Sequence, residues 1–493
     1  MPETPNILLI TGDHMNWETV CDRTVCRTPN INRVAEEGVS FERSYTAVSL
    51  CCPSRAMLLS GAYPWHNGVY NQVHVPESVH PDMFEDVVTY SQRLRDAGYR
   101  TAYIGKWHAS WTRGPSDFGY QVMREVGGFG PECRERLKDQ LEYSPRREAE
   151  KDATLVEPRH VTWPGGDRFL MWAGMDAGLE EVHEYRLATS TARTIREFRQ
   201  GEEPWLIELH FPQPHDAYTP LLQFLERYPL EDVELPVSFY EESFDDKPGL
   251  LAREARLWDE LSEEDFRQGR RHYFAYCEQL DHYVGMVLDA LEASDQAEDT
   301  LVVFSADHGD MVGAHQMFIK GWMPFEETHR VPMVARWPGR IPAGTTTDAL
   351  VHLHDWAHTF CDLAGARPLP HPDGENLAPL LEEPSEPPAD WPDHILNVYY
   401  GGEFLYTQRI AIGERCKYVF NGFDRDEFYD LEADPHEVHN AIDDRDYAAA
   451  VQETRDALWE LMAKYDDPYA GHRYGAGRYL PGHSKGPLRK SWD

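Results

Sequence analysis

The chain has 493 residues, of which 41% are hydrophobic and 12% aromatic, so it can bury a large core and is not globally disordered. Its formal net charge of −38 argues against a nucleic-acid-binding surface, because such surfaces neutralise phosphates with lysine and arginine. No apolar run approaches the ~18 residues of a membrane span, and residues 1–5 lack the basic start of a signal peptide. We therefore expect a cytoplasmic chain that binds neither nucleic acid nor membrane.

Short apolar runs and helical patterns alternate along the first two thirds of the chain. The runs predict buried strands over Asn6–Ile10, Arg100–Ile104, Trp205–Phe211, Thr300–Phe304 and Pro332–Ala335. The spacing of apolar residues predicts helices over Asn30–Glu37, Val87–Ala97, Leu187–Arg199 and Tyr273–Ala293. This alternation favours an α/β sandwich with a large mixed, mostly parallel sheet between helices.

The pattern changes after a stretch with eight prolines, Arg367–Pro392, which predicts an extended surface connection. Beyond it we expect four antiparallel strands, over Ile395–Tyr400, Tyr406–Ile412, Lys417–Asn421 and Glu427–Leu431, and a helix over Tyr447–Lys464. The predicted organisation is a catalytic domain over 1–385, a small α+β subdomain over 386–470 and a basic tail over 471–493. The tail is either a solvated terminus or a segment that wraps onto its own surface or a neighbouring subunit, as in a homo-oligomer.

Polar side chains follow four of the predicted strands. They are Asp13 and His14 after the first, Lys106 and His108 after the second, His215 after the third, and Asp307 and His308 after the fourth, with Lys320 close behind. Because ligands of open α/β sheets bind beyond the carboxyl ends of the strands, these residues together predict a site. Each alone has a structural alternative, such as a helix cap, a turn residue or a solvated lysine.

The two acid–imidazole pairs, Asp13-His14 and Asp307-His308, supply enough ligands for one divalent cation. Oxygen ligands favour Ca²⁺ or Mg²⁺ and imidazoles favour Mn²⁺ or Zn²⁺, so the set does not select the metal. His14 is the weaker ligand, because a second carboxylate would bind a hard cation more simply.

The segment from Ser49 to Gly61 is the most informative part of the sequence. Pro53 can open a helix that Gly61 ends, which places Cys51 at a helix N-terminus with Arg55 about one turn further on. The structural alternative is a pair of buried cysteines before an ordinary helix.

The pattern Cys51-x-Pro53-Ser54-Arg55, continued through Leu58-Leu59-Ser60-Gly61, resembles the signature of the sulfatases of the alkaline phosphatase superfamily. Matches in the family's order extend the likeness from Asn6 to the segment Phe428–Pro435. The resemblance implies an alkaline-phosphatase-like sandwich, in which the motif cysteine is converted after translation to formylglycine by a maturation enzyme. The hydrated aldehyde is then the nucleophile.

Carried over to this chain, the resemblance implies that Cys51, as formylglycine, attacks sulfur and touches the metal, that Arg55 stabilises the hydrated aldehyde, and that His108 orients it. Three residues would contact the sulfate group: Lys106, His215 and Lys320. Either Lys320 or His215 would protonate the departing alcohol. The metal ligands would be Asp13, His14, Asp307 and His308, around Ca²⁺ or alternatively Mg²⁺ or Mn²⁺. The family most often has two aspartates where this chain has Asp13-His14.

Three other functions compete with sulfate ester hydrolysis. Relatives with the same nucleophile cleave phosphonate monoesters and phosphodiesters, but they lack the Lys-x-His pair formed here by Lys106 and His108. A non-catalytic carbohydrate-binding or metal-binding protein would not need a proton donor beside the leaving group. A redox role for Cys51 and Cys52 is disfavoured, because vicinal cysteines form a disulfide only with strain.

Two long segments, Val122–Glu184 and Pro220–Phe266, interrupt the predicted core pattern, and we expect them to shape the mouth of the pocket. Their aromatic residues could stack on a substrate ring, but we expect half-buried packing for most of them: Trp163, Phe169, Trp172, Tyr228, Phe239, Tyr240 and Trp258. The net charge of −38 would repel a long polysulfated chain, so we expect a small or sparsely sulfated substrate.

Overall fold

The computed structural model describes residues 4–144, 154–371, 373–402, 406–422 and 424–470. The basic tail over 471–493 therefore lies outside the described residues. No helix in these ranges is both long and apolar enough to span a membrane.

The strands are β1 Asn6–Gly12, β2 Val39–Phe41, β3 Ser44–Tyr45, β4 Arg100–Lys106, β5 Val122–Gly127, β6 Leu141–Glu142, β7 Thr154–Thr162, β8 Arg168–Asp176, β9 Trp205–His210, β10 Thr300–Ala306, β11 Met333–Arg336, β12 Thr345–Thr347, β13 Val351–His352, β14 His394–Tyr399, β15 Gln408–Gly413, β16 Cys416–Phe420 and β17 Glu427–Asp430. The α-helices are α1 Pro29–Glu36, α2 Cys51–Ser60, α3 Pro64–Asn67, α4 Tyr90–Asp96, α5 Pro131–Leu137, α7 His183–Phe198, α8 Leu222–Leu225, α9 Val237–Glu241, α10 Gly249–Ala255, α11 Glu263–Glu292, α12 Glu326–His329, α13 Asp355–Leu363, α14 Ala378–Glu382 and α15 Ala448–Lys464.

Nine of these strands form one sheet in the order β12-β2-β11-β10-β1-β9-β4-β5-β6. The centre of the sheet is parallel, with Leu8 of β1 opposite Val302 of β10 and Ile207 of β9. Only β11 runs antiparallel to its neighbours. The predicted mixed, mostly parallel sheet is confirmed.

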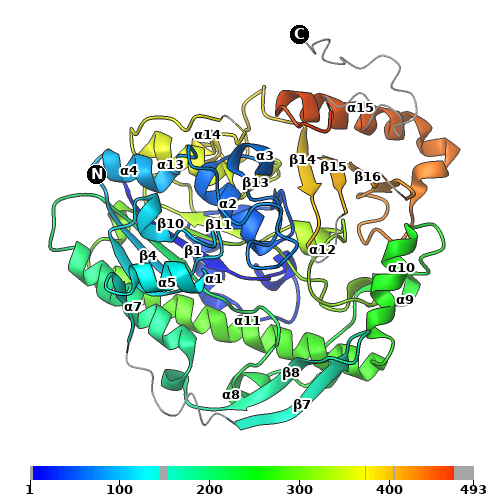
Figure 1. The fold of residues 1–493 in the computed structure, drawn as a ribbon, viewed down its shortest axis with the longest axis horizontal. Coiled ribbons are helices and arrows are strands. Elements are labelled where there is room, and N and C mark those ends of the chain that lie inside the picture. Colours follow the sequence, from blue (N-terminus) through cyan, green and yellow to red (C-terminus); the bar gives the residue numbers. More distant parts are fainter. Residues whose placement is uncertain (1–3, 145–153, 372, 403–405, 423, 471–493) are drawn as a thin grey trace.

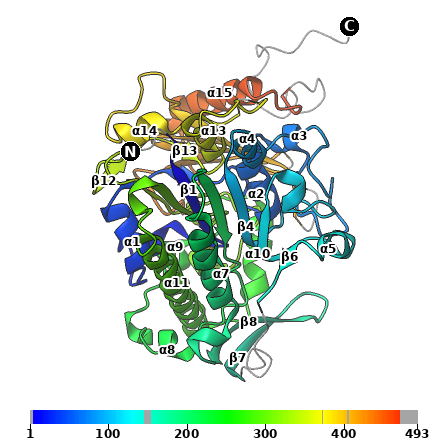
Figure 2. The same cartoon turned by 90° about the vertical axis from the view of Figure 1, so that its left-hand side faces the viewer.

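Helices cover both faces of the sheet. Leu8 and Ile10 of β1 pack into one apolar cluster, and Ile7 and Leu9 pack into another, because successive side chains of a strand point to opposite faces. Helices α1, α7 and α11 cover the first face and lie side by side in Figure 2, whereas α2, α4 and α13 cover the second. This double burial explains why the strands are continuously apolar in the sequence.

The four C-terminal strands pair antiparallel in the order β14-β15-β16-β17, with α15 packed against them (Figure 1). The predicted α+β region is therefore confirmed as an arrangement of elements. The domain boundaries at 385 and 470 stay predictions.

Several predicted boundaries are wrong. Helix α11 begins at Glu263, ten residues before the predicted start, because its first turns are charged and show no apolar spacing; Ser262 caps them with Asp265. Helix α4 begins at Tyr90 after the cap Thr89, and α7 begins earlier than predicted, at His183.

The predicted surface connection over Arg367–Pro392 is wrong at its centre, because the short helix α14 buries Leu380 and Leu381 there. The prediction that Val122–Glu184 interrupts the core is wrong for the first part of this segment, because β5 and β6 are strands of the large sheet. The rest of it includes the hairpin β7–β8, which lies away from the centre of the sheet (Figure 1).

Candidate active site

The central parallel strands deliver the predicted side chains to one edge of the sheet. Asp13 and His14 follow β1, Lys106 ends β4 and His108 comes two residues later, His215 follows β9, and Asp307 and His308 follow β10. Helix α2 adds Cys51 and Arg55, and the loop between β10 and α12 adds Lys320. Contacts between neighbouring side chains join these ten residues into one group.

Cys51 is the first residue of α2 and is buried. Its Sγ lies 3.2 Å from Nε2 of His308 and 3.7 Å from Oδ1 of Asp13. Burial raises the pKa of this thiol, but the charges of Lys106, Lys320 and His308 outweigh burial and hold the pKa well below its usual value. The position of Cys51 therefore favours an anion.

Cys52 has a different environment, although it is the next residue. It packs into the apolar cluster between the sheet and α2, α4 and α13. Burial, with a smaller contribution from the charge of Cys51, raises the pKa of the Cys52 thiol to about 12. Sγ of Cys52 also lies 3.9 Å from Nδ1 of His74. The two cysteines are therefore not equivalent, because only the surroundings of Cys51 favour an anion.

Arg55 links the two acid pairs. Its Nε lies 2.8 Å from Oδ2 of Asp307 and its Nη2 lies 3.7 Å from Oδ2 of Asp13. The Oδ1 atoms of both carboxylates face Nε2 of His308, each at 3.7 Å. Arg55 thus contacts Oδ2 of both carboxylates, whereas Oδ1 of both carboxylates faces His308.

Both imidazoles have an acceptor beside Nδ1. Nδ1 of His308 lies 2.9 Å from the carbonyl oxygen of Gly309, and Nδ1 of His14 lies 3.0 Å from Oδ2 of Asp310. Burial holds the pKa of His14 well below its usual value, so its ring is neutral. Because Nδ1 of each ring is taken by its acceptor, Nε2 is the atom of each ring that can bind a metal, the arrangement that orients metal-binding histidines. Tyr218 donates to Asp310 over 2.8 Å and fixes it in turn.

The donor set fits a single divalent cation. One ligand atom from each of Asp13, His14, Cys51 and His308 lies within 4.8 Å of the others, and all four residues are buried. Oδ1 of Asp307, which is outside this set of four, lies 3.7 Å from Nε2 of His308 and offers a second carboxylate oxygen. Carboxylate oxygens with imidazoles are ligands for Ca²⁺, Mg²⁺ or Mn²⁺. Nε2 of His14 also contacts Nζ of Lys320.

Two of the chain's nine lysines complete the group. Nζ of Lys106 contacts the carboxylate of Asp13, and Nζ of Lys320 lies 3.1 Å from Nε2 of His215. Burial lowers the pKa of both lysines, but the neighbouring anions, Asp13 and Cys51 for Lys106 and Cys51 with Asp216 for Lys320, raise it above its usual value. Both ammonium groups therefore stay charged and can bind an anion.

His108 lies at the rim of the group. Burial, aided by the charge of Lys106, lowers the pKa of its ring to about 4, so the imidazole is neutral. Among the described residues its Nδ1 has no hydrogen-bond partner, and its ring stacks on His74 at 4.9 Å between centroids.

Sequence reasoning missed several neighbours of this group. Gln72, whose Nε2 lies 3.8 Å from Sγ of Cys51, and His74 come from a loop with no recognisable pattern. Asp216 and Asp310 support His14, at 3.5 and 3.0 Å from its Nδ1. A signal for these two was present, since each belongs to a polar segment that follows a strand.

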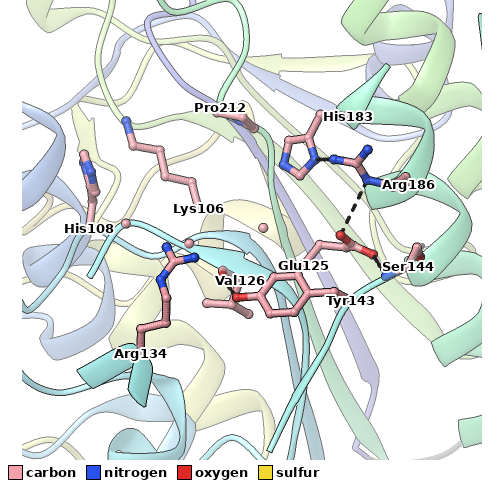
Figure 3. A pocket seen from close by; sticks show the side chains of 13 residues that line it. Lys106, His108, Glu125, Val126, Arg134, Tyr143, Ser144, His183, Arg186 and Pro212 are labelled. Atoms are coloured by element: carbon pink, nitrogen blue, oxygen red, sulfur yellow. Dashed lines mark hydrogen bonds and ion pairs between the residues drawn. The ribbon is translucent and has the colours of Figure 1, made fainter. Parts of the chain in front are cut away.

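A cavity of about 530 Å³ opens beside Lys106 and His108 (Figure 3). Most of its other lining residues come from the segment Val122–Glu184 and include Glu125, Arg134 and Tyr143, which supports the prediction that this segment shapes the pocket; Arg186 and Pro212 also line it. No residue of Pro220–Phe266 lines it, so the role of that segment at the mouth of the pocket stays a prediction.

For the aromatic residues of these two segments the sequence favours packing over stacking on a substrate ring in this cavity. None of the seven candidates lines it. Trp172, Tyr228 and Trp258 are buried in the core; Trp163, Phe169 and Phe239 pack half-buried against it; and Tyr240 is exposed. Packing is therefore their role in the structure.

The fold and the site belong to the class of hydrolases that act on anionic esters. Residues 5–366 match the family model described as Sulfatase, and residues 313–464 match the model described as N-sulphoglucosamine sulphohydrolase, C-terminal. The chain therefore belongs to the sulfatase family of the alkaline phosphatase superfamily and is a sulfuric ester hydrolase.

Curated relatives span nearly the whole chain. A choline-sulfatase of Rhizobium meliloti is 29% identical over 503 residues, covering 93% of this chain and 88% of the relative. An N-acetylglucosamine-6-O-sulfatase of Bacteroides thetaiotaomicron is 27% identical over 501 residues, covering 94% and 87%.

Solved structures share the fold. The protein BT4656, solved in complex with its substrate D-glucosamine-2-N,6-O-disulfate, superposes with a TM-score of 0.73 at 21% identity, covering 94% of this chain and 98% of that one. A phosphonate monoester hydrolase of Silicibacter pomeroyi superposes with a TM-score of 0.75 at 20% identity, covering 94% and 96%. At these identities the likeness establishes the fold alone.

Proposed function

We propose that the chain hydrolyses a sulfate monoester, on a sulfated carbohydrate or an aryl or alkyl sulfate, with a formylglycine made from Cys51 and one divalent cation. The observation that carries this proposal is the surroundings of Cys51. Its Sγ lies where Asp13, His308 and the charges of two buried lysines converge, whereas Cys52 faces the apolar core.

Formylglycine would be made from Cys51 by replacing its C–S bond with an aldehyde C=O. This change oxidises Cβ by two electrons, so it requires an oxidant supplied through a maturation enzyme, which we propose as a partner. The hydrated aldehyde would carry the attacking hydroxyl. Neutral His108 can accept a hydrogen bond from that hydroxyl, and the Arg55 guanidinium offers positive charge beside it.

The cation would be held by Asp13, Asp307, His308 and His14, with the side chain of residue 51 beside it. Ca²⁺ is the expected ion because the carboxylate oxygens are hard ligands, and Mg²⁺ or Mn²⁺ are the alternatives. A bound cation in such a site polarises the ester oxygens and lowers the pKa of the nucleophile.

The remaining residues would bind the sulfate and release the alcohol. The ammonium groups of Lys106 and Lys320 are fixed, buried charges that can stabilise negative charge developing on the sulfuryl oxygens. Nε2 of His215 lies 3.1 Å from Nζ of Lys320, and the His215 side chain is 31% exposed. This pair can pass a proton to the leaving oxygen at the solvent side of the site.

Phosphonate monoester or phosphodiester hydrolysis is the second candidate, because a phosphonate monoester hydrolase has the same fold. The Lys106-x-His108 pair favours sulfate, and the relatives with sulfatase in their names align along most of the chain.

The test compares the two chemistries on one preparation with matured Cys51. The substrates are 4-nitrophenyl sulfate, 4-nitrophenyl phenylphosphonate and bis(4-nitrophenyl) phosphate, which share a leaving group. We expect the highest kcat/KM for the sulfate, and a Cys51→Ala preparation as the control should be inactive on all three. A higher kcat/KM for the phosphonate or the diester would replace this proposal with the second candidate.

A further inference from the structure

The cavity beside Lys106 lies at the carboxyl edge of the sheet, and Cys51 is not among its lining residues. It is enclosed by β5, by the loop that leads to α5, and by the first turn of α7. In Figure 3, Lys106, His108 and Arg134 lie on one side, Glu125, His183 and Arg186 lie on the opposite side, and Tyr143 lies between them. A substrate whose sulfate sits at Lys106 would therefore extend its other groups over Arg134.

Arg134 is the unusual residue of this lining. Among the described residues no carboxylate lies within ion-pair distance of its guanidinium, which lies 5.7 Å from the centre of the Phe129 ring and close enough to Tyr143 for its charge to oppose the rise that burial causes in the pKa of that phenol. Its neighbour Arg136 shows the ordinary arrangement, with Nη2 2.6 Å from Oδ2 of Asp117. In a chain with a net charge of −38, an arginine without a carboxylate partner in a cavity is a ready site for an anion.

The far side of the cavity offers fixed polar groups of both signs. Glu125 is buried; its Oε1 accepts a hydrogen bond from the backbone N–H of Ser144 over 2.6 Å, and its Oε2 lies 3.6 Å from Nε of Arg186. Arg186 in turn lies 2.8 Å from Nδ1 of His183. Acceptors and donors held in this way suit the hydroxyl groups of a sugar.

We propose that this cavity binds a sulfated sugar that carries a second anionic group, a sulfate or a carboxylate, and that Arg134 binds that group. The inference rests on the proposed function, because it takes the scissile sulfate to lie at Lys106. It narrows the substrate class to a small acidic carbohydrate.

Two other classes fit the lining less well. An aryl sulfate would place a ring among charged side chains, since Tyr143 supplies the one phenyl ring among the described lining residues. A quaternary ammonium sulfate such as choline sulfate would meet the Arg134 guanidinium instead of the cage of aromatic faces that such cations prefer.

The test uses the matured enzyme with 4-nitrophenyl sulfate as reporter and a panel of inhibitors. The panel pairs glucose and galactose monosulfates with the disulfates that contain them, and adds the sulfated uronic acids and choline sulfate. Inhibition constants are measured for the wild type, for Arg134→Gln and Arg134→Glu, and for Arg136→Gln as a control on the same helix. Because Arg134 is exposed, these substitutions leave the core intact.

In the wild type at least one doubly anionic sugar should inhibit more tightly than its monosulfate. Arg134→Gln should weaken that preference by roughly 10- to 100-fold, the scale of a hydrogen bond between charged groups, and Arg134→Glu should reverse it. Arg136→Gln should leave it unchanged. A wild type without any such preference, a preference for choline sulfate, or equal effects of Arg134→Gln and Arg136→Gln would overturn the inference. Absence of sulfate turnover in the wild type would instead contradict the proposed function.

Discussion

Replacing Lys106 with alanine removes one fixed positive charge from the centre of the site. Its Nζ contacts the Asp13 carboxylate, and the side chain is only 10% exposed, so water replaces the charge poorly. At an effective dielectric constant of ~20, a unit charge ~4 Å from the developing sulfuryl charge contributes about 4 kcal/mol, or roughly 10³ in rate. Lys320 and Arg55 remain and compensate in part. We therefore expect kcat/KM for an aryl sulfate to fall by roughly 10² or more.

The assay measures 4-nitrophenyl sulfate and bis(4-nitrophenyl) phosphate on the same matured preparations. Any diesterase side activity should fall less than sulfatase activity, because the diester relatives manage without a Lys-x-His pair. Lys138→Ala, which removes an exposed lysine paired with Glu135, serves as the control and should change neither rate. Melting temperatures of both variants show whether the fold is intact. Intact sulfate turnover in a folded Lys106→Ala protein would refute the reasoning.

Three further predictions follow from the contacts. Asp307→Asn should lose most of its bound divalent metal, measured by elemental analysis, while circular dichroism stays native; full metal content would place the site elsewhere. Cys51→Ala should abolish sulfate release, whereas Cys52→Ala should retain both aldehyde formation and activity, and the opposite pattern would exclude our assignment of the nucleophile. Lys417→Met should lower the free energy of unfolding by about 3–5 kcal/mol, because Nζ of Lys417 lies 2.8 Å from Glu326 and 2.7 Å from Glu437, both buried. Without the lysine, these two carboxyl groups bind protons more tightly in the folded state. Denaturant melts should therefore show that the loss of unfolding free energy becomes smaller as the pH falls.

The sequence predicts the large sheet well because its central strands are buried on both faces. Leu8 and Ile7 pack on opposite sides of β1, so the run is apolar throughout and easy to recognise. Strands at the edges of the sheet, such as β6 at Leu141–Glu142, are too short to give such a signal. The sequence predicts only the last two thirds of helix α11, since its N-terminal turns are charged and only the cap at Ser262 marks their beginning.

The candidate site is predictable as far as its residues follow strands or belong to the Cys51 motif. The residues that support the site are harder to predict from the sequence. Gln72 and His74 reach the site from a loop, and the buried Glu125 accepts a hydrogen bond from the backbone of Ser144. Nor could the sequence distinguish Cys51 from Cys52 by environment. That difference arises only when α2 packs one cysteine toward the buried charges and the other into the core.

The most direct test of the account is to measure activity against the extent of Cys51 conversion. Preparations co-expressed with increasing amounts of a maturation enzyme are analysed by peptide mass spectrometry for aldehyde at Cys51, and sulfate release from one substrate is measured on each. We predict that kcat per mole of protein rises in proportion to the aldehyde fraction at Cys51 and extrapolates to zero when that fraction is zero. Sulfate release that is independent of the fraction, or that follows modification of Cys52, would contradict the account.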